Sequence, residues 1–73
     1  MPKLPRISGG ECVAVLQRFG FVQVRKRGSH VLMRRGAKGC PVPLHRELKV
    51  GTLGGILRQA GIDADEFVTA WKG

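Results

Sequence analysis

Residues 21–35 read FVQVRKRGSHVLMRR, and this stretch decides how the chain folds. Apolar and polar residues alternate at its start, three consecutive cations follow at 25–27, and Gly28-Ser29 is a tight-turn signal. A second apolar run comes after the turn. Two β-forming segments joined by two turn residues predict an antiparallel hairpin, with strands over 21–27 and 30–35.

The hairpin is expected to continue into a third strand. Residues 36–39, GAKG, are a second turn signal, and residues 40–44 are the third strand candidate. Pro41 and Pro43 cannot donate backbone hydrogen bonds to a neighbouring strand, which favours an edge position for this strand. The sequence therefore predicts a three-stranded antiparallel meander.

Helical patterns flank the meander on both sides. Ser8 begins a capping box, apolar residues follow at helical spacing, and Gly20 is a candidate left-handed cap at the end. An apolar stripe at residues 53, 56, 57 and 60 marks a second helix, into which the glycines at 51, 54 and 55 are expected to break. Gly61 is expected to close it in a Schellman-type turn. Asp63 is expected to cap a short last helix. We predict an α+β domain with its helices on one face of the sheet.

The length of 73 residues predicts one domain over residues 1–73, with an irregular lead-in at 1–6. The N-terminal residues lack the apolar core of a signal peptide, and no apolar run approaches the roughly 18 residues of a membrane span. We therefore expect a cytoplasmic protein with no membrane partner. Cys12 and Cys40 are too few for a disulfide framework and are expected to be reduced, small apolar side chains.

The formal net charge is +8, and the sequence pI is near 10.9. Most of this charge lies in residues 25–49, where eight lysines and arginines stand against Glu47 alone. Such a concentration of cations is typical of proteins that bind the phosphate backbone of nucleic acids. An anionic membrane surface, an acidic protein partner, or a solvated face that only aids solubility are the alternatives.

The alternation of the strands predicts which side chains share a face. We expect an open face that carries His30, Leu32 and Arg34, together with Gln23, Arg25 and Arg27 from the neighbouring strand. The opposite face is expected to pack under the helices and to carry Val22, Val24, Val31 and Met33. A shift of one residue in strand register would reverse this assignment.

His30 is the candidate catalytic residue. An imidazole titrates near neutral pH, so it can accept a proton from the 2′-hydroxyl that RNA supplies as its own nucleophile. The alternative is a histidine that only hydrogen-bonds at the hairpin. His45 can be a general acid, a phosphate ligand or a structural residue, and Ser29 a turn former or a hydroxyl that steadies the loop. No metal site is expected, because the spacing of Cys40 and His45 is wrong for zinc and carboxylates are sparse.

Several blocks of the sequence, in the same order, resemble the HicA (YcfA-like) family of mRNA interferase toxins. They are Ile7-Ser8-Gly9-Gly10-Glu11, Leu16 with Phe19-Gly20-Phe21, Gly28-Ser29-His30, Pro43-Leu44-His45 and residues 51–62. The resemblance extends over residues 7–68. It implies a double-stranded-RNA-binding-domain-like fold, helix–three-stranded meander–helix, here followed by the short C-terminal helix.

The resemblance also implies a function. HicA toxins are ribosome-independent endoribonucleases that cleave mRNA and are neutralised by a HicB antitoxin. The complex of toxin and antitoxin is expected to bind operator DNA mainly through the antitoxin. We expect no cofactor. The family's catalytic histidine maps onto His30. The candidate residues for binding RNA phosphates are Arg25, Lys26, Arg27, Ser29, Arg34 and His45. The alternatives are a non-catalytic RNA-binding module of the same fold and a small basic protein of a ribonucleoprotein particle.

Overall fold

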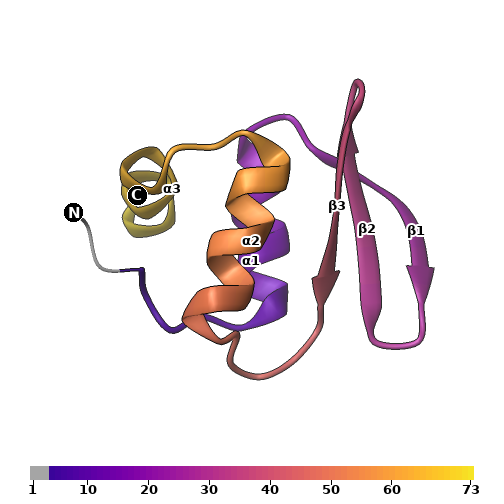
Figure 1. The fold of residues 1–73 in the computed structure, drawn as a ribbon, viewed down its shortest axis with the longest axis horizontal. Helices are drawn as coiled ribbons and strands as arrows, with labels where there is room; N and C mark the ends of the chain where they lie inside the picture. The colour runs from indigo at the N-terminus through magenta and orange to yellow at the C-terminus, as the bar shows by residue number, and fades with distance from the viewer. Residues whose placement is uncertain (1–3) are drawn as a thin grey trace.

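The computed structural model describes residues 4–73, so residues 1–3 of the expected lead-in lie outside the described part. The elements follow in the order α1 (Gly9–Arg18), β1 (Val22–Arg27), β2 (His30–Arg35), β3 (Lys38–Pro43), α2 (Val50–Ala60) and α3 (Ala64–Lys72) (Figure 1). The strands form one antiparallel sheet in the order β1-β2-β3. The predicted α+β class, the meander and the edge position of β3 are confirmed.

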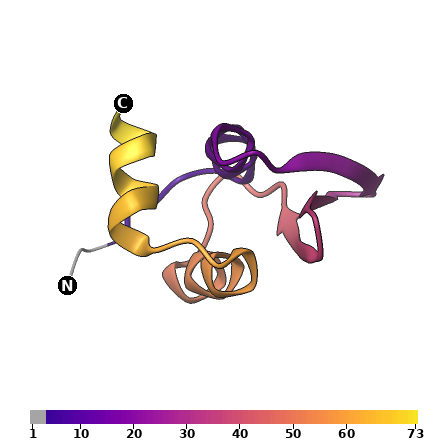
Figure 2. The same cartoon turned by 90° about the horizontal axis from the view of Figure 1, so that it is seen from above.

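The elements form three layers. Helices α1 and α2 lie side by side between the sheet and α3 (Figures 1 and 2). Both α1 and α2 contact β3, whereas β1 is the strand farthest from the helices, and all its residues are exposed. The sheet therefore projects beyond the helical layer, and β1 is open to solvent.

The ends of α1 follow the sequence signals. The Ser8 hydroxyl accepts a hydrogen bond from the Glu11 N–H at 3.0 Å, and the Glu11 carboxylate accepts one from the Ser8 N–H at 3.1 Å. After the helix, Gly20 has a φ of 90°, and the Phe21 N–H donates to the Leu16 carbonyl. The predicted capping box and the left-handed glycine are both confirmed.

Helix α2 is not interrupted by its glycines. Gly51, Gly54 and Gly55 were expected to break into it, but the helix is continuous from Val50 to Ala60. Gly61 follows with a φ of 71°, and the Ile62 N–H donates to the Leu57 carbonyl at 3.0 Å, as expected for a Schellman closure. The expected cap of α3 is present as well, since the Asp63 carboxylate accepts from the Asp65 N–H.

Two expectations about the sheet are wrong. Val22 and Val24 do not pack under the helices: they are 58% and 50% exposed. The register of β1 against β2 shifts between Gln23 and Arg25, so Val24 occupies a bulge and Val22 pairs with Arg34 on the open face. Gln23 pairs with Met33 and thus lies on the helix-facing side instead of the open face.

The second hairpin is tighter than predicted. Arg35 pairs with Lys38, which leaves a two-residue turn at Gly36-Ala37 and extends β3 to Lys38–Pro43 in place of the expected strand at 40–44. The left-handed φ of 60° at Gly36 explains why the turn closes so early. This register fixes which residues of β3 face His30.

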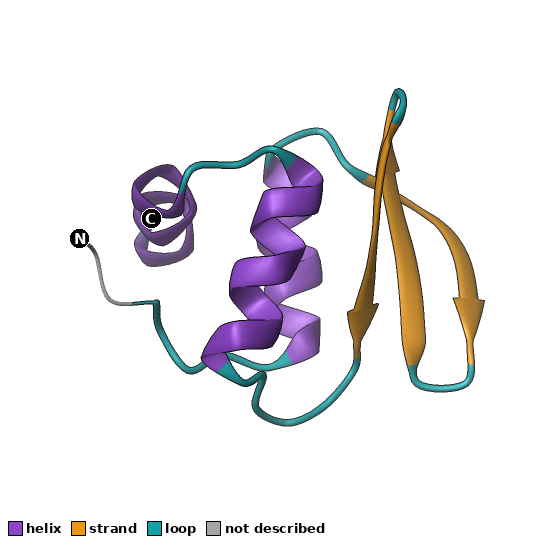
Figure 3. Cartoon of the chain, in the orientation of Figure 1, coloured by secondary structure: helices purple, strands orange, loops and turns teal. Residues whose placement is uncertain are grey.

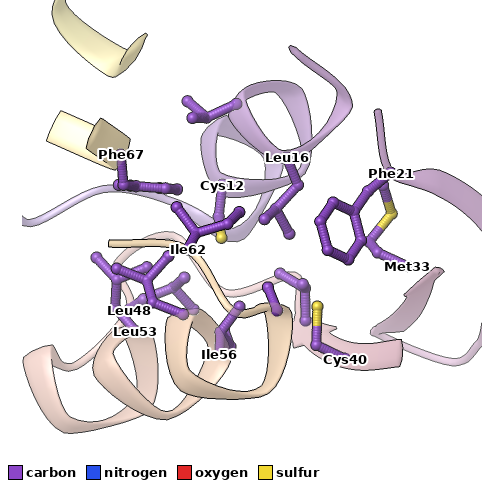
Figure 4. Packing of buried hydrophobic residues seen from close by; sticks show 14 of the residues in the cluster. Cys12, Leu16, Phe21, Met33, Cys40, Leu48, Leu53, Ile56, Ile62 and Phe67 are labelled. Carbon is purple, nitrogen blue, oxygen red and sulfur yellow. The ribbon is translucent and has the colours of Figure 1, made fainter. Parts of the chain in front are cut away.

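The core lies between the sheet and the three helices (Figure 4). Val31 and Met33 are buried in the core as predicted. From the start of the first hairpin, Phe21 is buried there instead of Val22 and Val24. Cys12 and Cys40 are both buried and unpaired. Burial raises the pKa of the Cys12 thiol to about 12, and it also raises the pKa of Cys40. Both thiols therefore stay protonated at neutral pH and act as small apolar side chains.

Candidate functional site

The structure brings the chain's two histidines together at one end of the sheet. His30 is the first residue of β2 and follows the Gly28-Ser29 turn, where Gly28 has the left-handed φ of 58°. His45 follows β3 in the loop that leads to α2, and both histidines are exposed. Their ring centroids lie 6.5 Å apart with the planes inclined by 70°. Residues 15 positions apart in the sequence thus form one imidazole pair.

Backbone hydrogen bonds fix this pair. His30 lies opposite Pro43 in the β2–β3 ladder, and the Leu44 N–H extends the ladder by donating to the Ser29 carbonyl at 2.6 Å. The His45 carbonyl accepts from the N–H of Gly9, the first residue of α1, at 2.9 Å. Figure 3 shows the β1–β2 turn, the loop after β3 and the starts of α1 and α2 at the same end of the molecule.

A groove of about 480 Å³ runs from His30 across the edge of the sheet to α2. It is open to solvent, as expected for a domain too small to enclose a deep cavity. Its lining residues come from β2, β3 and one face of α2: His30, Pro41, Pro43, Gly51, Thr52, Gly55, Ile56, Arg58 and Gln59. A single-stranded polymer can therefore lie along the groove and pass the His30 imidazole.

The N-terminus of α2 opens on this groove through Gly51 and Thr52. Its N-cap, Lys49, makes no side-chain capping hydrogen bond, and the first turn of α2 carries no acidic residue. Helices α1 and α3, in contrast, have side-chain caps and acidic first turns. The first-turn N–H groups and the helix dipole of α2 thus favour an anion at this end of the groove.

The candidate cations divide between the two faces of the sheet. Arg27 pairs with His30, and Arg25 pairs with Leu32, so both arginines lie on the His30 face. Arg34 shares that face through its alternation with His30 in β2. Lys26 instead pairs with Val31 on the opposite face. Residues 22–44 contain no Asp or Glu, so no carboxylate of the sheet competes for these cations.

The neighbouring Arg35 has a structural role that sets it apart from the candidate cations. Its Nη1 donates to the Phe19 carbonyl at 2.6 Å, and its guanidinium lies 5.1 Å from the centroid of the Phe21 ring. These contacts tie β2 to the corner between α1 and β1. Its charge is therefore engaged away from His30.

Sequence reasoning missed the polar contribution of α2 to the groove. Thr52, Arg58 and Gln59 all line it, whereas the apolar stripe of this helix predicts only its core-facing side. Gly51 and Gly55 have no side chains and therefore leave the surface of α2 hollow on their side. The sequence places polar residues on that same side, and this combination was the available signal for a groove. Ser29 contributes its backbone carbonyl to the loop, as described above.

Two further findings concern the described residues as a whole. Within residues 4–73, no three His, Cys, Asp or Glu side chains lie close enough together to hold a metal ion. In the same residues, no helix has the length and apolar character needed to cross a membrane.

A comparison with protein-family models matches residues 9–62 to the HicA toxin of bacterial toxin–antitoxin systems. The chain belongs to the HicA toxin family. The HicA match covers α1, the whole sheet and α2, and it contains both histidines and every residue that lines the groove. It makes the protein a toxin of a toxin–antitoxin system. A search of curated proteins gives no match.

Proposed function

We propose that this toxin is an endoribonuclease that cleaves mRNA and thereby inhibits translation, with His30 as the general base. The observation that carries the proposal is the position of His30, which is exposed at the head of an open groove and shares its face with Arg25, Arg27 and Arg34. An imidazole among cations provides a proton acceptor and a binding surface for phosphates. Membership of the HicA toxin family also supports a nuclease, because an endoribonuclease is the activity that this family implies.

In this mechanism His30 removes the proton from a ribose 2′-hydroxyl. The 2′-oxygen then attacks the adjacent phosphorus in line, the bond to the 5′-oxygen breaks, and a 2′,3′-cyclic phosphate forms. A general base typically contributes about 10²–10⁴-fold to the rate. Arg27, directly opposite His30, is the cation best placed to stabilise the charge that develops on the phosphoryl oxygens. The 2′-hydroxyl requirement restricts the reaction to RNA.

The groove gives the substrate its path. RNA on either side of the scissile phosphate would lie between β3 and α2, with a phosphate at the N-terminus of α2 and with Arg58 and Gln59 in reach of the next nucleotide. The chain offers few aromatic rings for base stacking, so binding through phosphates and the 2′-hydroxyl suits it better than reading of stacked bases.

We further propose that a HicB antitoxin neutralises the toxin by covering this face. An acidic partner surface would complement the arginines around His30 and exclude RNA from the groove. Operator DNA would be bound through the antitoxin in the complex. Protection of His30 from chemical modification of its imidazole in the complex is expected, and equal reactivity of His30 in free and bound toxin would contradict inhibition by coverage.

The same basic face also suits the second candidate, an RNA-binding module without catalysis. A cleavage assay on a defined single-stranded RNA, with a parallel binding assay, distinguishes the two functions. The nuclease predicts cutting by the wild type and none by His30→Ala, with RNA affinity largely retained in the variant. A binding module predicts salt-sensitive binding by both proteins and cutting by neither.

A further inference from the structure

We infer that His45 is the general acid that protonates the leaving 5′-oxygen, an assignment that rests on the proposed ribonuclease function. The two imidazoles are both exposed, and their ring centroids lie 6.5 Å apart. This separation is too long for a direct hydrogen bond between the rings. It is short enough for one phosphoryl group to bridge them, with one apical oxygen at each imidazole.

The chemistry requires two groups at such positions. In an in-line displacement, the attacking and leaving oxygens lie on opposite sides of phosphorus, so one residue cannot both take the first proton and deliver the second in the same step. Each proton transfer needs a heavy-atom distance of about 2.6–3.2 Å to its oxygen. His45 is the one other imidazole of the chain, and the fold places it beside His30.

The backbone holds His45 in place for this task. Its own carbonyl accepts from the Gly9 N–H, and the preceding residue, Leu44, donates to the carbonyl of the residue before His30. A side chain at Gly9 would collide with the Pro43 carbonyl oxygen and come within 2.7 Å of the Leu44 Cα. The N-terminus of α1 therefore packs directly on the end of β3 that leads to His45, and the residues that precede the two histidines are hydrogen-bonded to each other.

Cations are available to hold the phosphate that would lie between the two rings. Arg27 lies opposite His30, Arg46 follows His45, and Arg58 lines the adjoining groove. Guanidinium groups bind phosphate oxygens through charge-assisted hydrogen bonds. They can therefore keep the scissile phosphate beside both imidazoles.

In the cleavage step, one bond forms, one bond breaks and two protons move. The 2′-hydroxyl proton moves to His30, the bond from the 2′-oxygen to phosphorus forms, and the bond from phosphorus to the 5′-oxygen breaks. The His45 imidazolium delivers its proton to that 5′-oxygen. The products are a 2′,3′-cyclic phosphate and a 5′-hydroxyl, with His30 protonated and His45 neutral, and proton exchange with water restores both residues.

The test compares two RNA substrates of the same sequence. One has the natural 5′-oxygen at the cleavage site, and the other has a bridging 5′-sulfur, whose thiolate leaves without protonation. For His45→Ala we expect cleavage of the natural RNA to fall about 10²–10⁴-fold. Cleavage of the 5′-thio RNA by the same variant should stay within a few-fold of the wild type. His45→Gln, which keeps a hydrogen-bonding side chain but transfers no proton, should behave identically.

Other outcomes distinguish a failure of the His45 assignment from a failure of the proposed ribonuclease function. Equal losses on both substrates would mean that His45 binds RNA or supports the loop, and undiminished cleavage of the natural RNA by His45→Gln would also overturn its role as acid. His30→Ala should be inactive on both substrates, since the base is needed in each case. Cleavage of both substrates by His30→Ala would instead refute the proposed function itself.

Discussion

Arg27 lies directly across the β1–β2 ladder from His30, and the two side chains therefore share one face of the sheet. The preceding residue, Lys26, lies opposite the buried Val31 and so belongs to the other face. Of these two adjacent cations on one exposed strand, only Arg27 thus lies on the same face as the His30 imidazole. This difference makes them a matched pair for testing whether position or charge alone matters.

We predict that Arg27→Ala lowers the rate of cleavage of bound RNA far more than Lys26→Ala does. Loss of a group that stabilises the charged transition state typically costs about 10²–10³-fold in kcat. Lys26→Ala removes the same charge from the opposite face, so it should weaken RNA binding modestly and leave kcat within a few-fold. Single-turnover experiments at saturating toxin measure the rate constant for cleavage of bound RNA. An equal fall of this rate constant in both variants would contradict the prediction.

The sequence sufficed for the element types, the helix caps and the order of the strands, because these depend on local signals such as Ser8 with Glu11 and Gly61 with Ile62. It did not suffice for the faces of β1. A bulge at Val24 has no local signal in this sequence, since valine favours a regular strand. The position of β1 beyond the helical layer also cannot be read from its alternation.

The candidate site was predictable only in its separate parts. His30 and the arginines could be named from their place in the hairpin. The proximity of His30 to His45, however, depends on the register of β2 against β3, which the early turn at Gly36 sets. The contribution of Arg58 depends on how α2 packs beside the strand edge. Both are tertiary relationships between segments far apart in the chain.

Gly9→Ala is expected to destabilise the fold by roughly 1–3 kcal/mol, as overpacking of a close contact usually does. The added methyl group would meet the backbone of Pro43 and Leu44, which cannot move without disturbing the strand end. Gly10→Ala is the matched control: its methyl group would meet only the Ser8 hydroxyl at 3.8 Å, so the better helix propensity of alanine should leave stability unchanged or raised. Urea unfolding of both variants checks the prediction, and equal midpoints would contradict it.

Stability should depend on the ionisation of Glu11. Hydrogen bonds from the Ser8 backbone and the Trp71 side chain lower the pKa of this carboxyl below its ordinary value of 4.5. A lowered pKa in the folded state means that the stabilisation is complete above pH 4.5 and is lost as the pH falls through the folded value. The excess stability of the wild type over Glu11→Gln should therefore shrink on acidification below pH 4.5. A difference that is constant with pH would contradict the proposed origin.

The groove can be tested through two adjacent glycines of α2. Gly55→Leu places a side chain in the groove beside His30 and should raise the KM for RNA while the fold remains intact. Gly54→Leu adds the same side chain between Leu4 and the Arg58 guanidinium, and Gly54 is not among the residues that line the groove, so KM should rise less than in Gly55→Leu. Both variants gain helix propensity by up to ~1 kcal/mol relative to glycine. Unchanged KM in Gly55→Leu would show that RNA does not use this groove.

The role of His30 as general base is tested most simply by identifying the RNA ends that the purified toxin produces in the presence of EDTA, beside those of His30→Ala. With His30 as the general base, we expect 2′,3′-cyclic phosphate and 5′-hydroxyl ends from the wild type and no cleavage above background from the variant. Ends with a 3′-hydroxyl and a 5′-phosphate, or equal cleavage by the variant, would contradict a mechanism in which His30 activates the ribose 2′-hydroxyl.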